Sequence, residues 1–187
     1  MNVLAVYGSN YGQAEAVLQR VSQVLETHGV DVTVFKGNDI PEDLAVEGFD
    51  AMVVAASIRM GRYQTYIRDF VKRHNAALCA CPSAFVSVNG SQSESAPEWR
   101  DEAQGYVRKF LEQTAWQPRW TATFAGALRY RRYDPVTRWI VKSINGRRGG
   151  ATDTSREYEF TDWHAVDRFA EDLAEALGGQ AEFAPAT

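Results

Sequence analysis

The chain has 187 residues, of which 45% are hydrophobic, and its formal net charge at pH 7 is −4. This length and composition fit one globular domain with a sizeable core. The acidic balance excludes a general nucleic-acid binder, and the longest apolar run, residues 51–56, is far shorter than the roughly 20 residues of a membrane-spanning helix. No export signal precedes the first apolar run, so we expect a cytoplasmic protein in which Cys79 and Cys81 are reduced thiols.

The first predicted element is a buried strand at Val3–Tyr7, which passes through a short loop, Gly8–Ala14, directly into a helix. At such a junction several backbone N–H groups point into one pocket at the positive end of the helix dipole, so the pocket suits a phosphate. The alternative interpretation is an ordinary strand-to-helix turn in which Ser9 is the N-cap. The candidate phosphate-binding residues are Ser9, Asn10, Tyr11, Gly12, Gln13 and Ala14.

The rest of the chain alternates between strand and helix patterns. Continuous apolar runs predict parallel strands covered on both faces, at Val3–Tyr7, Ala51–Ala56, Ser83–Val88 and Thr121–Leu128. The segment Val30–Phe35 alternates apolar and polar residues, which indicates an edge strand. Helical stripes separate the strands, and the last helix is expected to end at Gly178-Gly179. We therefore predict an α/β fold with a doubly wound five-stranded parallel sheet over residues 1–178, followed by a flexible tail at 179–187.

Ligands of such sheets bind at the carboxyl ends of the strands, near the point where the strand order reverses. The loops there include residues 8–14, 57–61 and 89–98, which are rich in Gly, Ser and Asn. The first loop lacks the Lys-Ser/Thr ending of a P-loop and the G-x-G-x-x-G of a dinucleotide turn, and only Asp39 keeps a ribose ligand open. A loop of hydroxyl and amide groups without a cation suits a phosphate monoester, and FMN is the commonest such ligand on this kind of sheet.

A long insert, at about residues 129–150, separates the last predicted strand from the last helix. Between Arg129 and Arg148 it carries seven Lys or Arg residues and one acidic residue, Asp134, which indicates an anionic partner. Pro135 can begin an amphipathic helix there. Contact with an anionic membrane surface, a clamp for substrate carboxylates and a homo-oligomer interface are the competing interpretations. The residues assigned to substrate or membrane contact are Arg129, Arg131, Arg132, Arg138, Trp139 and Lys142.

Five motifs carry a resemblance to a known family: YGSNYGQAE at residues 7–15, ASIRMGRY at 56–63, PSAFVSVN at 82–89, FAGALRY at 124–130 and GGATDT at 149–154. Together they resemble the menaquinone-dependent protoporphyrinogen IX dehydrogenase family, which comprises flavodoxin-like FMN enzymes of haem biosynthesis. The resemblance extends from about residue 1 to residue 177. Two departures from the family pattern are Ala14, where many flavodoxin-like loops have Thr, and a polar, slightly acidic loop after Asn89.

The resemblance implies a flavodoxin-like fold with strand order 2-1-3-4-5 and FMN as the cofactor. It implies oxidation of protoporphyrinogen IX to protoporphyrin IX, with electrons passed to a membrane quinone at the cytoplasmic face of the cell membrane. Arg59 is expected beside the flavin ring, where a cation would raise the reduction potential. The cofactor-binding candidates from the second and third loops are Ser57, Ile58, Arg59, Gly61, Ser87, Val88, Asn89 and Gly90.

Two alternative functions remain open at this point: a flavodoxin-type electron carrier and another FMN-dependent quinone reductase. The basic insert favours the dehydrogenase, because carriers are usually acidic throughout. The sequence isolates no catalytic acid or base. The three histidines, His28, His74 and His164, show no metal-ligand spacing, so no metal site is expected.

Overall fold

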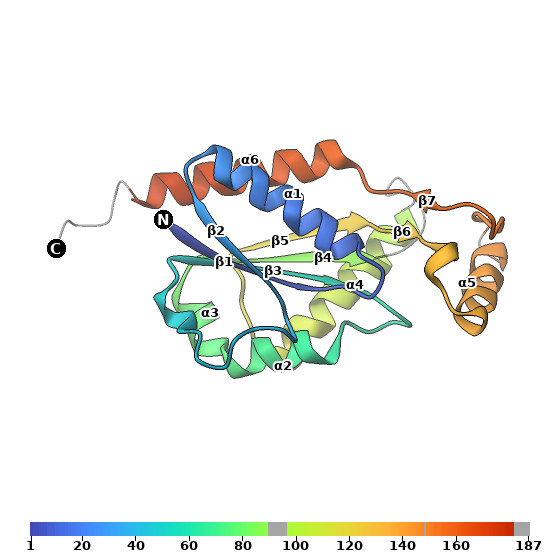
Figure 1. Cartoon of the computed structure of the whole chain (residues 1–187), viewed down its shortest axis with the longest axis horizontal. Helices are drawn as coiled ribbons and strands as arrows, with labels where there is room; N and C mark the ends of the chain where they lie inside the picture. Colours follow the sequence, from blue (N-terminus) through green and yellow to red (C-terminus); the bar gives the residue numbers. More distant parts are fainter. Residues whose placement is uncertain (90–96, 148, 182–187) are drawn as a thin grey trace.

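Figure 1 shows the computed structural model of the chain, which describes residues 1–89, 97–147 and 149–181. A five-stranded parallel sheet in the order β2-β1-β3-β4-β5 forms its centre. This order confirms the predicted doubly wound topology and places the alternating segment, β2, at one edge of the sheet. The strands are β1 (Asn2–Gly8), β2 (Asp31–Lys36), β3 (Ala51–Ser57), β4 (Ser83–Asn89) and β5 (Trp120–Ala125).

Helices cover both faces of this sheet (Figure 1). One face packs against α1 (Gln13–Thr27) and α6 (Trp163–Ala181). The other face packs against α2 (Thr65–Arg73), α3 (Asn75–Ala80) and α4 (Pro97–Thr114), and a short 3-10 helix, Val46–Gly48, precedes β3. The short helix α3 was not predicted, because its six residues are too few to show a helical period.

Strand β1 shows why the predicted strands read as continuous apolar runs. Val3 and Ala5 lie in the core cluster beneath α1 and α6, whereas Leu4 and Val6 lie in the cluster on the α2 side. Successive side chains of a strand point to opposite faces, so a sheet with helices on both sides buries every residue of its central strands.

The last predicted strand, residues 121–128, is wrong as a single element. Strand β5 ends at Ala125, and although the Gly126 N–H still donates to the Asn89 carbonyl (3.2 Å), the Gly126 carbonyl accepts from the Phe160 N–H (3.1 Å). The chain then enters a separate antiparallel ladder, in which β6 (Ala127–Leu128) pairs with β7 (Tyr158–Glu159). The insert is therefore enclosed by a ladder and extends to residue 159, beyond the predicted 150.

The prediction that Gly178-Gly179 ends the last helix is also wrong, because α6 continues to Ala181. Neither glycine has the positive φ of a left-handed C-cap, and added Cβ atoms there would meet nothing within 4 Å. By contrast, Gly29 has φ 76° immediately after α1 and ends that helix as predicted. Most of the predicted flexible tail, residues 182–187, lies outside the described residues.

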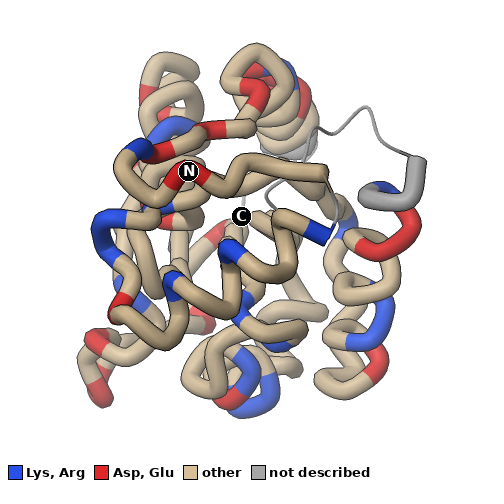
Figure 2. Tube along the Cα trace, turned by 90° about the vertical axis from the view of Figure 1, so that its right-hand side faces the viewer, with Lys and Arg blue, Asp and Glu red and all other residues tan. Residues whose placement is uncertain are grey.

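The insert contains a 3-10 turn, Tyr130–Arg132, and the helix α5 (Pro135–Arg147). Helix α5 begins at Pro135 as predicted, and the Asp134 carboxylate caps it by accepting the N–H groups of Val136 (3.1 Å) and Thr137 (3.0 Å). Figure 1 shows α5 beyond the carboxyl ends of the strands, and Figure 2, which looks toward that end, shows Lys and Arg recurring along it. The basic segment therefore lies where ligands of this topology bind.

Candidate functional site

The loop between β1 and α1 leaves the start of the helix open. Gly8 passes so close to α2 that an added Cβ would lie 2.4 Å from Ile67 Cγ1. Gly12 is the N-cap residue with φ 90°, and the Ser9 hydroxyl accepts its N–H (2.9 Å). No side chain among the described residues caps α1, so Ser9 is not its N-cap, and the N–H groups of the first turn can bind an anion.

Two predicted loop residues turn their side chains away from this opening. Ala14 is fully buried in the core beneath α1. The Gln13 amide Nε2 donates to Thr161 Oγ1 (2.8 Å), while its Oε1 accepts from Arg129 Nη2 (3.0 Å). Gln13 thus fastens the loop to the insert, and both residues can offer only backbone N–H groups to a phosphate.

The loop after β3 forms a tight hairpin at the pocket. The backbones of Arg59 and Arg62 exchange hydrogen bonds of 2.9 and 3.1 Å, while Met60 and Gly61 between them have φ of 50° and 76°. These angles fit a two-residue turn with positive φ at both central positions, and the Met60 side chain at its tip is 75% exposed. The hairpin holds Ser57, Ile58, Arg59 and Met60 at the cavity, whereas Gly61 lines a separate depression with Arg62.

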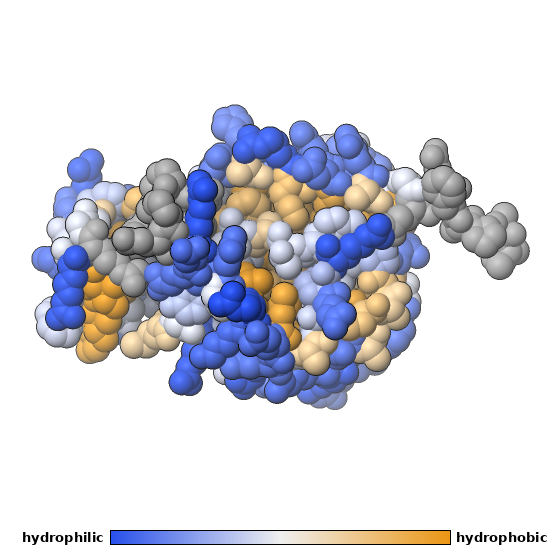
Figure 3. Space-filling view, turned by 180° about the vertical axis from the view of Figure 1, so that it is seen from behind, coloured by the Kyte–Doolittle hydropathy of each residue, from blue (hydrophilic) through white to orange (hydrophobic). Residues whose placement is uncertain are grey.

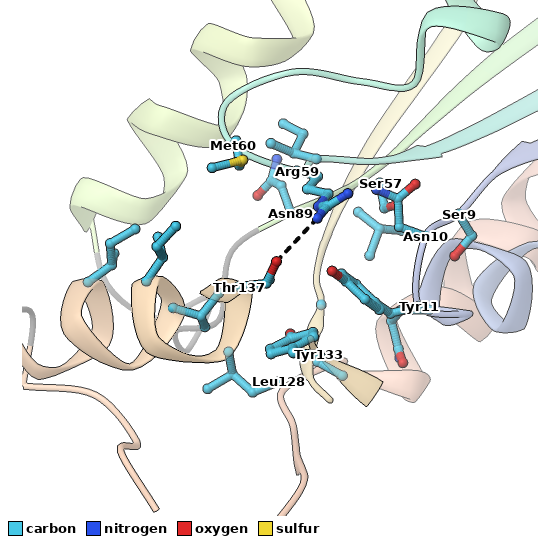
Figure 4. A pocket seen from close by; sticks show the side chains of 18 of the residues that line it. Ser9, Asn10, Tyr11, Ser57, Arg59, Met60, Asn89, Leu128, Tyr133 and Thr137 are labelled. Atoms are coloured by element: carbon cyan, nitrogen blue, oxygen red, sulfur yellow. Dashed lines mark hydrogen bonds between the residues drawn. The ribbon is translucent and has the colours of Figure 1, made fainter. Parts of the chain in front are cut away.

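Arg59 crosses the mouth of the cavity to the insert. Its Nη2 donates to the Thr137 hydroxyl on α5 (3.2 Å), and its guanidinium carbon lies 5.8 Å from the centre of the Tyr11 ring (Figure 4). Among the described residues that line the cavity, Arg59 is the only charged one. The guanidinium is therefore placed to meet an electron-rich ring or a carboxylate inside the cavity.

The end of β4 supplies the third part of the site. Val88 and Asn89 line the cavity, but Ser87 is fully buried behind it. The Ser87 hydroxyl shares a hydrogen bond with the Tyr63 hydroxyl (2.7 Å) and accepts from Asn89 Nδ2 (3.1 Å), and burial raises the pKa of Tyr63. Ser87 therefore orients Asn89 from behind. The remaining candidate, Gly90, lies outside the described residues.

The insert forms the opposite wall of this cavity, whose volume is about 220 Å³. Tyr133 packs edge-on against Tyr11 with ring centroids 4.5 Å apart, and burial raises the pKa of its hydroxyl. Sequence analysis did not name Tyr133 as a site residue, because a tyrosine in a basic segment gives no sign that it packs on a loop more than a hundred residues away. The other insert residues lining the cavity are Ala127, Leu128, Thr137, Ile140, Val141, Ile144 and Asn145.

The basic candidates of the insert divide between internal and external roles. Arg129 forms ion pairs with Glu157 (2.9 Å) and Glu159 (3.3 Å), so acidic residues just beyond the predicted insert neutralise it. Arg131 donates to the Ser155 carbonyl (3.1 Å), and Arg138 donates to the Tyr130 carbonyl (2.9 Å).

The other three candidates remain accessible. Arg132 donates to the carbonyl of Tyr11 (3.3 Å), and Lys142 is exposed on α5. Trp139 is 69% exposed beside Val136, which is 66% exposed. Figure 3 shows hydrophobic residues among hydrophilic ones at the end of the molecule that carries α5. The outer face of α5 thus combines apolar and cationic side chains.

Comparisons with known proteins agree with this geometry. The family model of the flavodoxin domain matches residues 4–155. A flavodoxin from the domain Archaea has a TM-score of 0.53 at 17% identity, covering 95% of this chain and 99% of the other. A Streptococcus pneumonia flavodoxin has a TM-score of 0.55 at 16% identity, covering 94% of this chain and 99% of the other. These low identities show the fold alone. By fold and family model, the chain is a flavodoxin-domain protein, the FMN-binding class expected from the sequence.

More similar relatives place the chain within this class. Protoporphyrinogen IX dehydrogenase (quinone) of Escherichia coli (strain K12) is 37% identical over 175 residues, which are 93% of this chain and 95% of that protein. The Leishmania major protein of the same name is 33% identical over 174 residues, covering 91% of this chain and 74% of the other. The chain belongs to the protoporphyrinogen IX dehydrogenase (quinone) family.

Two further findings concern metals and membranes. Within residues 1–89, 97–147 and 149–181, no group of three or more His, Cys, Asp or Glu side chains could hold a metal ion. None of the helices in these ranges is both long enough and apolar enough to span a bilayer.

Proposed function

We propose that this protein is an FMN-dependent oxidoreductase that oxidises protoporphyrinogen IX to protoporphyrin IX and passes the electrons to a quinone. The observation that carries the proposal is that the insert forms one wall of the cavity that begins at the phosphate loop. A ligand that enters this cavity from the α5 side therefore approaches the cofactor site. Family membership supports the substrate and the acceptor, because the relatives carry the name of that reaction.

The residues present fit FMN. Phosphate donors gather at one end of the cavity, where the first turn of α1 is uncapped and the Ser9 hydroxyl lies beside it. Toward α5 the wall becomes apolar through Leu128, Ile140 and Ile144, which suits a flat ring system and excludes water. When bound, FMN supplies hydride acceptance from the substrate and electron transfer to the quinone.

Within the cavity, the chain orients reactants and supplies no nucleophile. Arg59 provides a positive charge at the hairpin, and we assign it to the electron-rich part of the ring or to a substrate carboxylate. Asn89 is held by Ser87 and offers amide hydrogen-bonding groups at the end of β4. These groups stabilise charge and fix geometry, while the cofactor carries the redox chemistry.

The proposal includes peripheral contact with an anionic membrane surface through the outer face of α5. Val136, Trp139 and Ile144 are exposed apolar residues on this helix, and Lys142 is exposed among them. An amphipathic helix with a Trp and cations suits the boundary between lipid headgroups and acyl chains. Because α5 also lines the cavity, such contact would bring a lipid-soluble quinone close to the cofactor.

The direct test is turnover by the purified, FMN-loaded protein. Under anaerobic conditions, protoporphyrinogen IX and a soluble menaquinone analogue should yield fluorescent protoporphyrin only when both the flavin and the quinone are present. Ile140→Asn, which places an amide in the apolar wall, should lower kcat/KM for porphyrinogen about tenfold with FMN still bound. Val34→Asn, on the far edge strand, is the matched control.

The alternatives give a different result. A protein that binds FMN and exchanges electrons with a redox partner but forms no porphyrin would be an electron carrier. Flavin reduction by a nicotinamide, with no reaction with porphyrinogen, would indicate another quinone reductase. Either result would contradict the proposed reaction without affecting the assignment of the cofactor site.

A further inference from the structure

The phosphate loop itself brings no positive charge to its ligand. Residues 8–14 contain no Lys or Arg, and the first charged residue after them is Glu15, in the first turn of α1. The Glu15 carboxylate accepts the Tyr7 hydroxyl (2.9 Å), and burial together with this hydrogen bond raises the pKa of Tyr7 to about 12. A phosphate monoester carries close to two negative charges at neutral pH, so it would be repelled by Glu15 unless another segment supplied a cation.

The insert supplies that cation through Arg132. Its Nη1 donates to the Tyr11 carbonyl (3.3 Å), and a Cβ added at Gly12 would lie only 3.3 Å from the same nitrogen. Glycine at position 12 therefore provides both the left-handed backbone and the space for the guanidinium. Arg132 and Lys36 line one depression together with Ser9, Asn10, Gly12 and Glu15 of the loop.

The charge of Arg132 is still available. In the described part of the chain, Arg132 makes one hydrogen bond, to a carbonyl, and no ion pair. A guanidinium has five N–H donors, so most remain for an anion. Arg129, in the same segment, is neutralised by two glutamates, and Arg138 is held by the carbonyls of Tyr130 and Tyr133. Arg132 differs from both because it reaches the loop with its charge uncompensated.

The backbone that carries Arg132 is held in place by its neighbours. Tyr133 is buried between Tyr11, at 4.5 Å, and Tyr130, at 5.8 Å between ring centroids. Its hydroxyl accepts the Arg129 N–H (3.1 Å), and the Tyr130 hydroxyl donates to the Ala151 carbonyl (2.7 Å). The 3-10 turn is therefore packed against the loop before any ligand arrives, so little ordering is needed when the guanidinium binds.

We propose that Arg132 is a cofactor-binding residue that neutralises the FMN phosphate from outside the phosphate loop. This inference rests on the proposed FMN cofactor and changes the role of a residue that the sequence assigned to substrate or membrane contact. It makes the basic insert part of the cofactor site as well as a wall of the substrate cavity. Lys36 adds a second positive charge to the same depression.

The test compares two flavins that differ only in the phosphate. Dissociation constants of FMN and riboflavin are measured by flavin fluorescence quenching on apoprotein of wild type, Arg132→Met and Arg131→Met. Arg132→Met should weaken FMN about tenfold, because a charge-assisted bond is lost while Lys36 remains, and should change riboflavin by less than about twofold. The loss should shrink as salt is raised. Arg131→Met, whose guanidinium meets the Ser155 carbonyl, should match wild type.

Two outcomes would overturn the inference. The first is FMN affinity within about twofold of wild type, since the phosphate would then not depend on Arg132. The second is an equal loss of FMN and riboflavin, because Arg132 would then act only by holding the loop. In both cases wild-type FMN binding and porphyrinogen turnover would stand, whereas a wild type that binds no FMN would contradict the proposed function itself.

Discussion

At the scale of single residues, the site depends on side chains that join segments distant in sequence. Arg59 reaches Thr137 on the insert, Gln13 meets Thr161 and Arg129, and Tyr133 packs on Tyr11. Each contact joins a loop of the sheet to the insert, so the cavity between them has a fixed shape. A residue that belongs to a loop motif can thus serve the insert, as the Gln13 side chain does.

Arg59 offers a prediction that separates cofactor tuning from cofactor binding. Arg59→Ala should leave FMN bound but lower its two-electron midpoint potential by about 20–30 mV, because about 1 kcal/mol of stabilisation of the electron-rich reduced flavin is lost at an exposed site. Equilibration with reference dyes measures the potential. Arg62→Ala, on the same hairpin but facing a different depression, should leave it unchanged. An equal potential in wild type and Arg59→Ala would remove Arg59 from the redox role.

The candidate site could be predicted in part from these residues. The phosphate loop, the Arg59 hairpin and the β4 end follow from strand ends and motifs, and the structure brings Ser9, Asn10, Ser57, Arg59 and Asn89 to one place. Sequence could not show that the Ser87 side chain faces inward or that Arg132 meets the phosphate loop. Side-chain direction and long-range contacts depend on packing, which a one-dimensional pattern does not contain.

At the scale of elements, α5 is the part of the fold that performs two tasks. Its inner residues Ile140, Val141 and Ile144 line the cavity, while Val136 and Trp139 face outward. The Pro135 start and the Asp134 cap fix where the helix begins, and hydrogen bonds from Thr137 and Val136 hold the pKa of Asp134 below its ordinary value. Helix position and orientation therefore follow from local capping together with the packing of the preceding 3-10 turn.

The outer face of α5 predicts a measurable membrane affinity. Trp139→Ser should reduce binding to vesicles containing anionic lipid about tenfold, because about 1–2 kcal/mol of apolar burial is lost. Co-sedimentation with and without anionic lipid, at low and high salt, measures the effect. Val34→Ser, an exposed apolar residue on β2, is the control and should bind as wild type does. Wild-type protein that fails to bind anionic vesicles at any salt concentration would exclude the membrane contact.

Element boundaries were less predictable than element types. The five strands and the α5 start follow from apolar runs and from Pro135, yet residues 121–128 separate into β5 and β6, and α6 passes through Gly178-Gly179. An apolar run continues across Gly126 because both ladders bury their residues, so hydropathy alone does not show where the hydrogen-bonding partner changes. The glycines do not end α6 because their backbone stays helical.

At the scale of the whole molecule, the doubly wound sheet gathers the loops at one end, and the insert covers that end (Figure 1). The net charge of −4 conceals an uneven distribution, since α5 carries Arg138, Lys142 and Arg147 with no acidic residue in its sequence. Anionic ligands and surfaces are thus attracted to the end of the molecule that holds the cavity, although the molecule as a whole is acidic.

Cofactor binding should stabilise the entire domain. FMN at about 100 times its dissociation constant should add about 2.7 kcal/mol to the free energy of unfolding, and so raise the Tm by about 5–10 °C for a domain of this size. Differential scanning calorimetry of apoprotein with increasing FMN measures the shift. Riboflavin at the same concentration should give a smaller shift, since it lacks the phosphate. A Tm independent of FMN concentration would contradict the cofactor assignment.

The sequence by itself determined the sheet, its strand order, the phosphate loop and the family, because buried strands, helix stripes and motif spacing are local patterns of residue type. Only the tertiary structure decided what the insert does: Arg129, Arg131 and Arg138 hold it together, Arg132 is delivered to the phosphate loop, and Trp139 stays outside. The physical reason is that a guanidinium has no fixed role until folding selects its neighbours. Whether its charge is neutralised, spent on carbonyls or left for a ligand depends on contacts between distant parts of the chain.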